Sequence, residues 1–125
     1  MSSLHRRARH RDLLVPVRVR TARLDTVLAD CNHEDLRLAL WIDVAGKAFE
    51  AIEGARGLFP RVHLLHVEVE TEPCIGWEQK LFSHVQTLLA HSGFVLLATD
   101  QTHDKSQFNA LFIRRDLKFA MHLRI

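Results

Sequence analysis

Hydrophobic residues follow two different spacings along this chain, and each spacing predicts a different kind of element. A nearly continuous apolar run at residues 38–44 predicts a strand buried on both faces, as in a parallel sheet. Val62–Glu70 and Phe94–Thr99 predict two more strands, and residues 108–114 predict a fourth that returns antiparallel to the third. Apolar and polar residues alternate at positions 15–20, which predicts a short additional strand near the N-terminus.

Apolar residues at helical spacing separate these strands. Helices are predicted at residues 24–28, from residue 49 to 55 or 56, and at residues 77–89, where the amphipathic pattern is clearest. Gly54 and Gly57 mark the end of the second segment and Pro60 prevents its continuation, whereas Gly93 ends the third. Strands that alternate with helices indicate an α/β protein with parallel strands and right-handed crossovers, here ending in an antiparallel hairpin.

Length and composition restrict the class of protein. The 125 residues suffice for one domain, and 47% hydrophobic with 26% charged residues is typical of a globular chain. No apolar run approaches the length of a membrane span, and the N-terminus has no apolar segment of a signal peptide, so we expect a cytoplasmic protein without membrane contact. Cys31 and Cys74 form no C-x-x-C motif and are expected to be free thiols.

Charge is distributed unevenly. Residues 1–20 contain six arginines against Asp12 alone, a net charge of +5, so the remainder carries −3. We therefore expect a basic, disordered arm at residues 1–14 followed by a partial α/β domain at residues 15–125. A basic arm can bind nucleic acid, but this one has no aromatic residue for base stacking, which disfavours that role.

Several motifs resemble a known family in their order. L-W-I-D-V-A-G at residues 40–46, followed by F-E-A-I-E-G-A at residues 49–55, resembles the FkbM signature of an apolar strand, an I-D-V-E-G-like turn and a helix ending in L-x-G-A. Residues 21–28 are similar to the family's T-L-D-x-L segment, and residues 66–70, 92–94 and 109–115 follow at similar spacing. The chain thus resembles the C-terminal half of an FkbM-type S-adenosylmethionine (SAM) dependent methyltransferase.

The resemblance implies the C-terminal half of a class I, Rossmann-like methyltransferase sheet, in which parallel strands end in an antiparallel hairpin. It also implies SAM as cofactor and, as ancestral activity, O-methylation of a hydroxyl on a sugar or secondary metabolite. Ala45 and Ala48 depart from the family, which has acidic residues there. Members of the fold bind SAM with a glycine-rich turn, but no G-x-G occurs here and all five glycines lie after residue 45. We therefore expect a truncated protein that binds no SAM alone.

Three acidic residues are candidates for catalysis. Asp43 ends the 38–44 strand, where the full fold would place the transferred methyl group, and is predicted to act as an acid, a base or a substrate-orienting group. Its alternative role is to cap the following helix. Glu68 and Glu70 end the next strand at the same edge and can reach a substrate; alternatively they are solvated residues at a strand end.

Other polar and aromatic residues yield weaker hypotheses. His66, Glu68 and Glu70 share one strand face, as three zinc ligands would. No H-x-x-x-H or C-x-x-C motif supports such a site, so we expect no bound metal. Trp41 and Trp77 are expected to be core or sheet-covering aromatics.

A function without catalysis is the alternative. If no strands precede residues 38–44 in the sheet, this strand is left at an edge with unpaired backbone groups. The chain would then be an interaction module that forms a homo-oligomer or docks to a complementing N-terminal half. The family resemblance adds a small-molecule acceptor as a partner.

Overall fold

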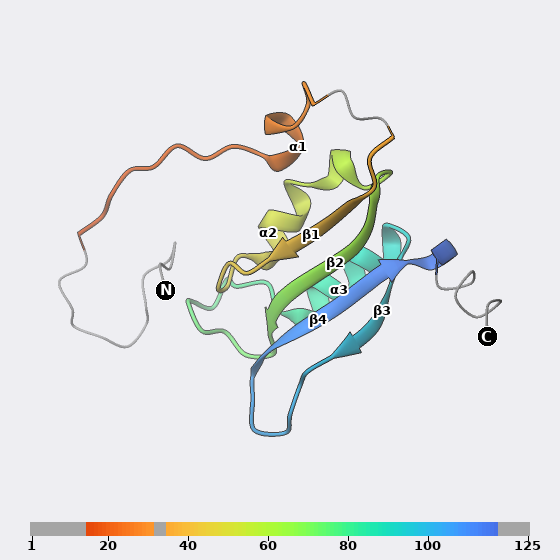
Figure 1. Ribbon diagram of the computed structural model, residues 1–125. Coiled ribbons are helices and arrows are strands. Elements are labelled where there is room, and N and C mark those ends of the chain that lie inside the picture. The colour runs from red at the N-terminus through yellow and green to blue at the C-terminus, as the bar shows by residue number, and fades with distance from the viewer. Residues whose placement is uncertain (1–14, 32–34, 118–125) are drawn as a thin grey trace.

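The computed structural model describes residues 15–31 and 35–117, and these contain a four-stranded sheet with helices (Figure 1). The predicted arm at residues 1–14 lies outside the described residues. The elements, in chain order, are α1 (Leu24–Val27), β1 (Leu38–Ile42), α2 (Ala48–Glu53), the 3₁₀ turn η1 (Arg56–Leu58), β2 (Val62–Glu70), α3 (Phe82–His91), β3 (Phe94–Thr99) and β4 (Gln107–Arg114).

The sheet has the order β1-β2-β4-β3. β1 and β2 are parallel, whereas β4 is antiparallel to both β2 and β3. This arrangement confirms the α/β class and the antiparallel hairpin at the end of the chain. β4 inserts between β2 and β3, so that β1 and β3 form the two edges of the described sheet.

Helices α2 and α3 cover one face of the sheet (Figure 1). The buried residues of α3 are Val85, Leu88 and Leu89, whose spacing of three and four places them on one side of the helix. They pack against strand residues that include Leu65 and Phe112. Burying such side chains stabilises the fold by about 1.5–3 kcal/mol each.

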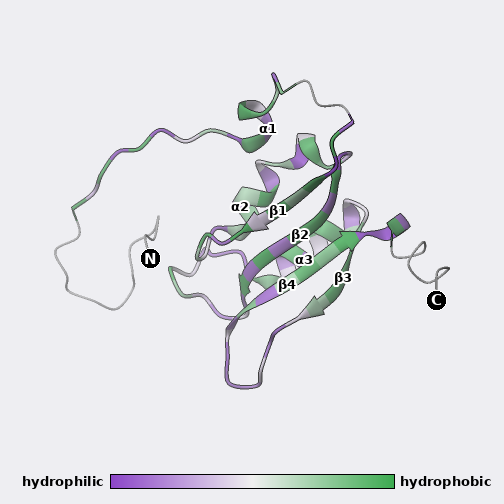
Figure 2. Cartoon of the chain, in the orientation of Figure 1, coloured by the Kyte–Doolittle hydropathy of each residue, from purple (hydrophilic) through white to green (hydrophobic). Residues whose placement is uncertain are grey.

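No described element covers the opposite face of the sheet (Figure 1). The prediction that the 38–44 strand is buried on both faces is therefore wrong, and exposure alternates along β1 instead. Trp41 on this face is 74% exposed and stacks on His66 of β2, with ring centroids 3.9 Å apart. Figure 2 shows hydrophobic residues along all four strands and a hydrophilic loop between β3 and β4.

Two further predictions need correction. Residues 15–20 form no strand; Val15, for example, is 80% exposed. α3 begins at Phe82 rather than at Trp77, and Trp77 is 93% exposed instead of buried in the core. The physical reason is the side chain of Gln79, which accepts hydrogen bonds from the backbone N–H groups of residues 74 and 75 and so stabilises a loop there.

Within the described ranges, no helix combines the length and the apolar character needed to cross a membrane. Cys31 and Cys74 are both free and exposed, as the sequence predicted.

Candidate functional site at the carboxyl ends of β1 and β2

The parallel pairing of β1 with β2 brings together the acidic residues that the sequence singled out. Ile42 is paired with Val67, so Asp43 follows β1 at the same level at which Glu68 lies on β2. Glu70 ends β2 two residues later. Open α/β sheets bind their ligands at the carboxyl ends of parallel strands, so this edge of the sheet is the candidate functional site.

Asp43 and Glu68 form a pair of interacting carboxyls. Burial raises the pKa of Glu68, and Asp43 raises it further through a hydrogen bond and through its like charge. Among the described residues, no group donates a hydrogen bond to the buried Oε2 atom of Glu68. The alternative role of Asp43 as a helix cap is wrong, because the N-cap of α2 is Lys47 and no side chain caps it.

A polar cavity of about 470 Å³ lies beside Glu68. Its other lining residues come from the β3–β4 loop and the start of β4: Asp100, Asp104, Lys105, Ser106, Gln107, Phe108 and Asn109. Asp100 holds Asn109 through two hydrogen bonds, one from its backbone N–H at 2.6 Å and one from its side-chain amide at 2.8 Å. These bonds lower the pKa of Asp100, so one wall of the cavity consists of a carboxylate that is hydrogen-bonded to a neutral amide.

Glu70 has a different environment from Glu68. It is only 3% exposed, so the alternative of a solvated strand end is wrong for this residue. Its Oε1 atom accepts a hydrogen bond from the backbone N–H of Gly46 at 3.0 Å, and its Oε2 atom accepts one from Gln79 Nε2 at 3.0 Å. Burial is the main cause that raises the pKa of Glu70. Both oxygens are therefore engaged within the protein.

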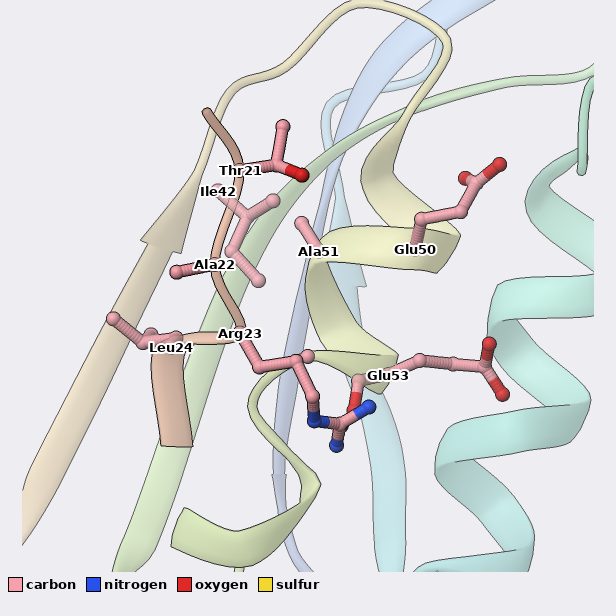
Figure 3. A pocket seen from close by; sticks show the side chains of 9 residues that line it. Thr21, Ala22, Arg23, Leu24, Ile42, Glu50, Ala51 and Glu53 are labelled. Atoms are coloured by element: carbon pink, nitrogen blue, oxygen red, sulfur yellow. Dashed lines mark hydrogen bonds between the residues drawn. The ribbon is translucent and has the colours of Figure 1, made fainter. Parts of the chain in front are cut away.

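A second hollow lies at the free edge of β1. It is a groove of about 530 Å³, mostly apolar, that separates residues 21–24 from Ile42 and from one side of α2 (Figure 3). Arg23 crosses it and donates a hydrogen bond to the backbone carbonyl of Glu53 at 2.8 Å. Because its lining is mostly apolar, the groove suits the binding of an apolar segment.

In the described part of the chain, no three His, Cys, Asp or Glu residues are placed so that they could hold a metal ion. His66, Glu68 and Glu70, which the sequence places on one strand face, do not form such a group, because Glu70 turns toward Gly46 and Gln79 while His66 stacks on Trp41.

The comparison with known families agrees with the order of motifs along the chain. The family model described as the methyltransferase FkbM domain matches residues 2–96. This chain belongs to the FkbM methyltransferase family. Comparisons with curated proteins and with solved structures found no match.

The structure explains why the FkbM signature residues occur together. The I-D-V-A-G turn carries Asp43 and places Gly46 at φ +73°, a conformation that favours glycine. Ala48, the first residue of α2, is 3% exposed and lies in the core. An acidic side chain at this position would have to be buried at a desolvation cost, which alanine avoids. β4 lies beyond the matched residues but pairs with the matched β2.

FkbM methyltransferases use SAM, and the glycine turn at the candidate edge of the sheet does not fit that cofactor. Three glycines have positive φ, and Gly46 is the one at the candidate edge of the sheet. Its N–H is bonded to Glu70, and a Cβ placed there would lie 2.2 Å from Ile75 Cδ1. The space above this turn is thus filled by protein and is not open to a ligand.

Some residues of this FkbM site could not be found from the sequence. Asp100, Asn109 and Gln79 carry no motif, and their contacts depend on loops whose course only the structure shows. A weak signal existed for Asp100, since an acidic residue between two predicted strands often stabilises a turn.

Proposed function

We propose that this chain forms the acceptor-binding side of a SAM-dependent O-methyltransferase that acts on a hydroxyl of a sugar or secondary metabolite. The interacting pair of Asp43 and Glu68, at the carboxyl ends of two parallel strands in an FkbM family member, carries this proposal. The parallel pair followed by an antiparallel hairpin supports an assignment to the C-terminal half of a class I methyltransferase sheet.

The pair provides the chemistry that a hydroxyl acceptor needs. A hydroxyl becomes a better nucleophile when a carboxylate accepts its proton as the oxygen forms its new bond. Asp43 takes this role, and Glu68, whose pKa is raised by burial and by Asp43, lies beside it as the second carboxyl of the pair. Removal of either carboxyl should therefore slow proton transfer.

The lining of the adjacent cavity suits a polyhydroxylated ligand. Carboxylates and amides bind hydroxyl groups, whereas three acidic residues against Lys105 repel an anionic acceptor. A neutral or cationic sugar fits this charge better than a sugar phosphate.

The donor site must come from residues other than those described. Because no G-x-G occurs in the chain and Ile75 fills the space at Gly46, we propose that a complementing N-terminal half supplies SAM binding. Alone, the chain should be inactive.

Calorimetric titration with SAM and with S-adenosylhomocysteine tests this proposal. We expect no heat of binding up to millimolar ligand. Micromolar affinity would contradict the need for a complementing half.

The acceptor site is tested with a neutral methyl glycoside and its 6-phosphate. The backbone amide NMR signals of Glu68 and Asn109 should shift with the neutral sugar only, and a preference for the phosphate would overturn the assignment.

A second candidate function is an interaction module without catalysis. β1 is an edge strand of the described sheet, and both the apolar groove and the exposed Trp41 lie along it. Unpaired edge strands and exposed aromatic residues favour association, here with a second copy or with the complementing half. Sedimentation velocity at tens of micromolar should then detect a dimer; a monodisperse monomer contradicts homo-oligomerisation.

A further inference from the structure

A buried chain of hydrogen bonds joins the two loops at the candidate edge of the sheet. Glu70 accepts from the backbone N–H of Gly46 and from Gln79 Nε2, both at 3.0 Å. Gln79 Oε1 in turn accepts from the backbone N–H groups of Cys74 at 2.8 Å and Ile75 at 3.1 Å. Four hydrogen bonds thus run from the β1–α2 turn, across the end of β2, to the loop before α3.

Only one assignment of donors and acceptors satisfies this chain of hydrogen bonds. Both Glu70 oxygens face donors, so the carboxylate only accepts. Gln79 donates at one end and accepts at the other, and a rotated amide would place Nε2 against two backbone N–H groups. Since Glu70 and Gln79 are 3% and 9% exposed, water does not compensate for a mismatch.

The same turn carries the candidate catalytic residue. Asp43 lies three positions before Gly46, and the turn between them is closed by a hydrogen bond from Lys47 N–H to the Val44 carbonyl at 2.7 Å. Ile75, at the other end of the chain of hydrogen bonds, packs directly over Gly46. Glu70, by its hydrogen bond, and Ile75, by its packing, therefore fix the position of the turn from two sides.

We propose that Glu70 and Gln79 are a positioning pair that holds the β1–α2 turn so that Asp43 faces Glu68. Glu70 then acts through Asp43 and not on the substrate, which differs from its predicted role in catalysis. The consequence for methyl transfer rests on the proposed function; the positioning itself does not.

Exchanging the two side chains tests the pair. In Glu70→Gln two amide groups that both donate face each other, and in Gln79→Glu two carboxylates face each other. Each single variant therefore breaks the chain of hydrogen bonds. The double variant E70Q/Q79E restores every donor and acceptor in mirrored order and keeps the net charge. We expect amide hydrogen exchange at Gly46 and Ile75 to be about tenfold faster in each single variant and near the wild-type rate in the double variant.

Exchange at Leu89, in the helix core, is the control for global unfolding, and circular dichroism confirms that each variant is folded. If the single variants leave the Gly46 and Ile75 rates unchanged, or if the double variant is no better than the singles, the proposal is overturned.

A second measurement separates positioning from simple stabilisation. The variant Gln79→Ala removes hydrogen bonds but keeps the charge of Glu70. NMR titration of the Glu68 carboxyl should show a lower pKa in this variant than in the wild type, because Asp43 moves away while the charge of Glu70 stays in place. An unchanged titration together with fast exchange at Gly46 would overturn the positioning role. Failure of sugar binding alone, with both results as expected, would count against the proposed function and leave the pair intact.

Discussion

The backbone N–H of Gly57 donates a hydrogen bond of 3.0 Å to the carboxylate of Asp25, from a position 32 residues away in the chain. Arg23 binds the same carboxylate at 2.8 Å and also the carbonyl of Glu53. Asp25 N–H completes the junction by donating to the Gly54 carbonyl at 2.9 Å. The T-L-D-like segment of the family is thereby attached to the end of the signature helix.

This junction should make stability depend on acidic pH. Its hydrogen bonds lower the pKa of Asp25 to about 2, below its value in the unfolded chain. The stabilisation is therefore complete above the unfolded pKa and is lost as the pH falls from about 4 to about 2. We expect Asp25→Asn to flatten this part of the stability profile, measured by urea unfolding at several pH values. A profile unchanged by the substitution would contradict the assignment.

Gly57 should tolerate no side chain. A Cβ there would lie 2.9 Å from the Cβ of Asp25, so Gly57→Ala forces α1 to shift and should cost about 1–3 kcal/mol. Gly54→Ala is the matched control, because the atoms nearest its Cβ are 3.4 Å away. Chemical unfolding should show Gly57→Ala as clearly less stable than Gly54→Ala; equal stability would contradict the close contact.

Gly46 should be sensitive for two separable reasons. Its φ of +73° costs a non-glycine residue roughly 1–2 kcal/mol, and the added Cβ would collide with Ile75. Gly93 also has a positive φ, but nothing lies within 4 Å of its Cβ position. Gly93→Ala therefore measures the backbone cost alone. We expect Gly46→Ala to lower the thermal midpoint more than Gly93→Ala, and the reverse order would refute the packing of Ile75 on the turn.

Glu68 should destabilise the fold when its carboxyl is ionised, because the carboxyl is partly buried beside Asp43. Its raised pKa means that its contribution is most favourable below the unfolded pKa and is lost as the pH rises through the folded pKa. Glu68→Gln should therefore stabilise the chain at neutral pH and remove the contribution of Glu68 to the pH dependence of stability. The exposed Glu72→Gln is the control. Destabilisation by Glu68→Gln at neutral pH would show that the pair does not strain the fold.

Trp41 should contribute to association and little to folding. Because it is 74% exposed, Trp41→Ala should change the free energy of unfolding by no more than about 1 kcal/mol. If the open sheet face associates, the same substitution weakens the dimer seen in sedimentation, whereas Trp77→Ala, in a loop, does not. Equal effects of the two variants on association would contradict a role for this face.

Patterns along the chain predicted most of the secondary structure. Val62–Glu70 and Phe94–Thr99 have the predicted bounds, because short segments rich in β-branched and other apolar residues favour strands of a sheet. The family and the location of Asp43 and Glu68 at one edge also followed from sequence, since parallel strands align their carboxyl ends. The N-terminal strand at residues 15–20 failed because alternation alone supplies no neighbouring strand for pairing.

Sequence by itself determined most of the elements, the family and the acidic residues at the edge of the sheet, because these depend on local periodicity and on motifs. Only the tertiary structure decided that Glu70 is buried while Glu68 faces a cavity, although both lie on the same face of one strand. That difference arises from Gly46 and Gln79, which approach Glu70 from two loops. Hydrogen bonds between segments distant in sequence produce no periodic pattern of residues, so the environment of each carboxyl depends on the tertiary structure.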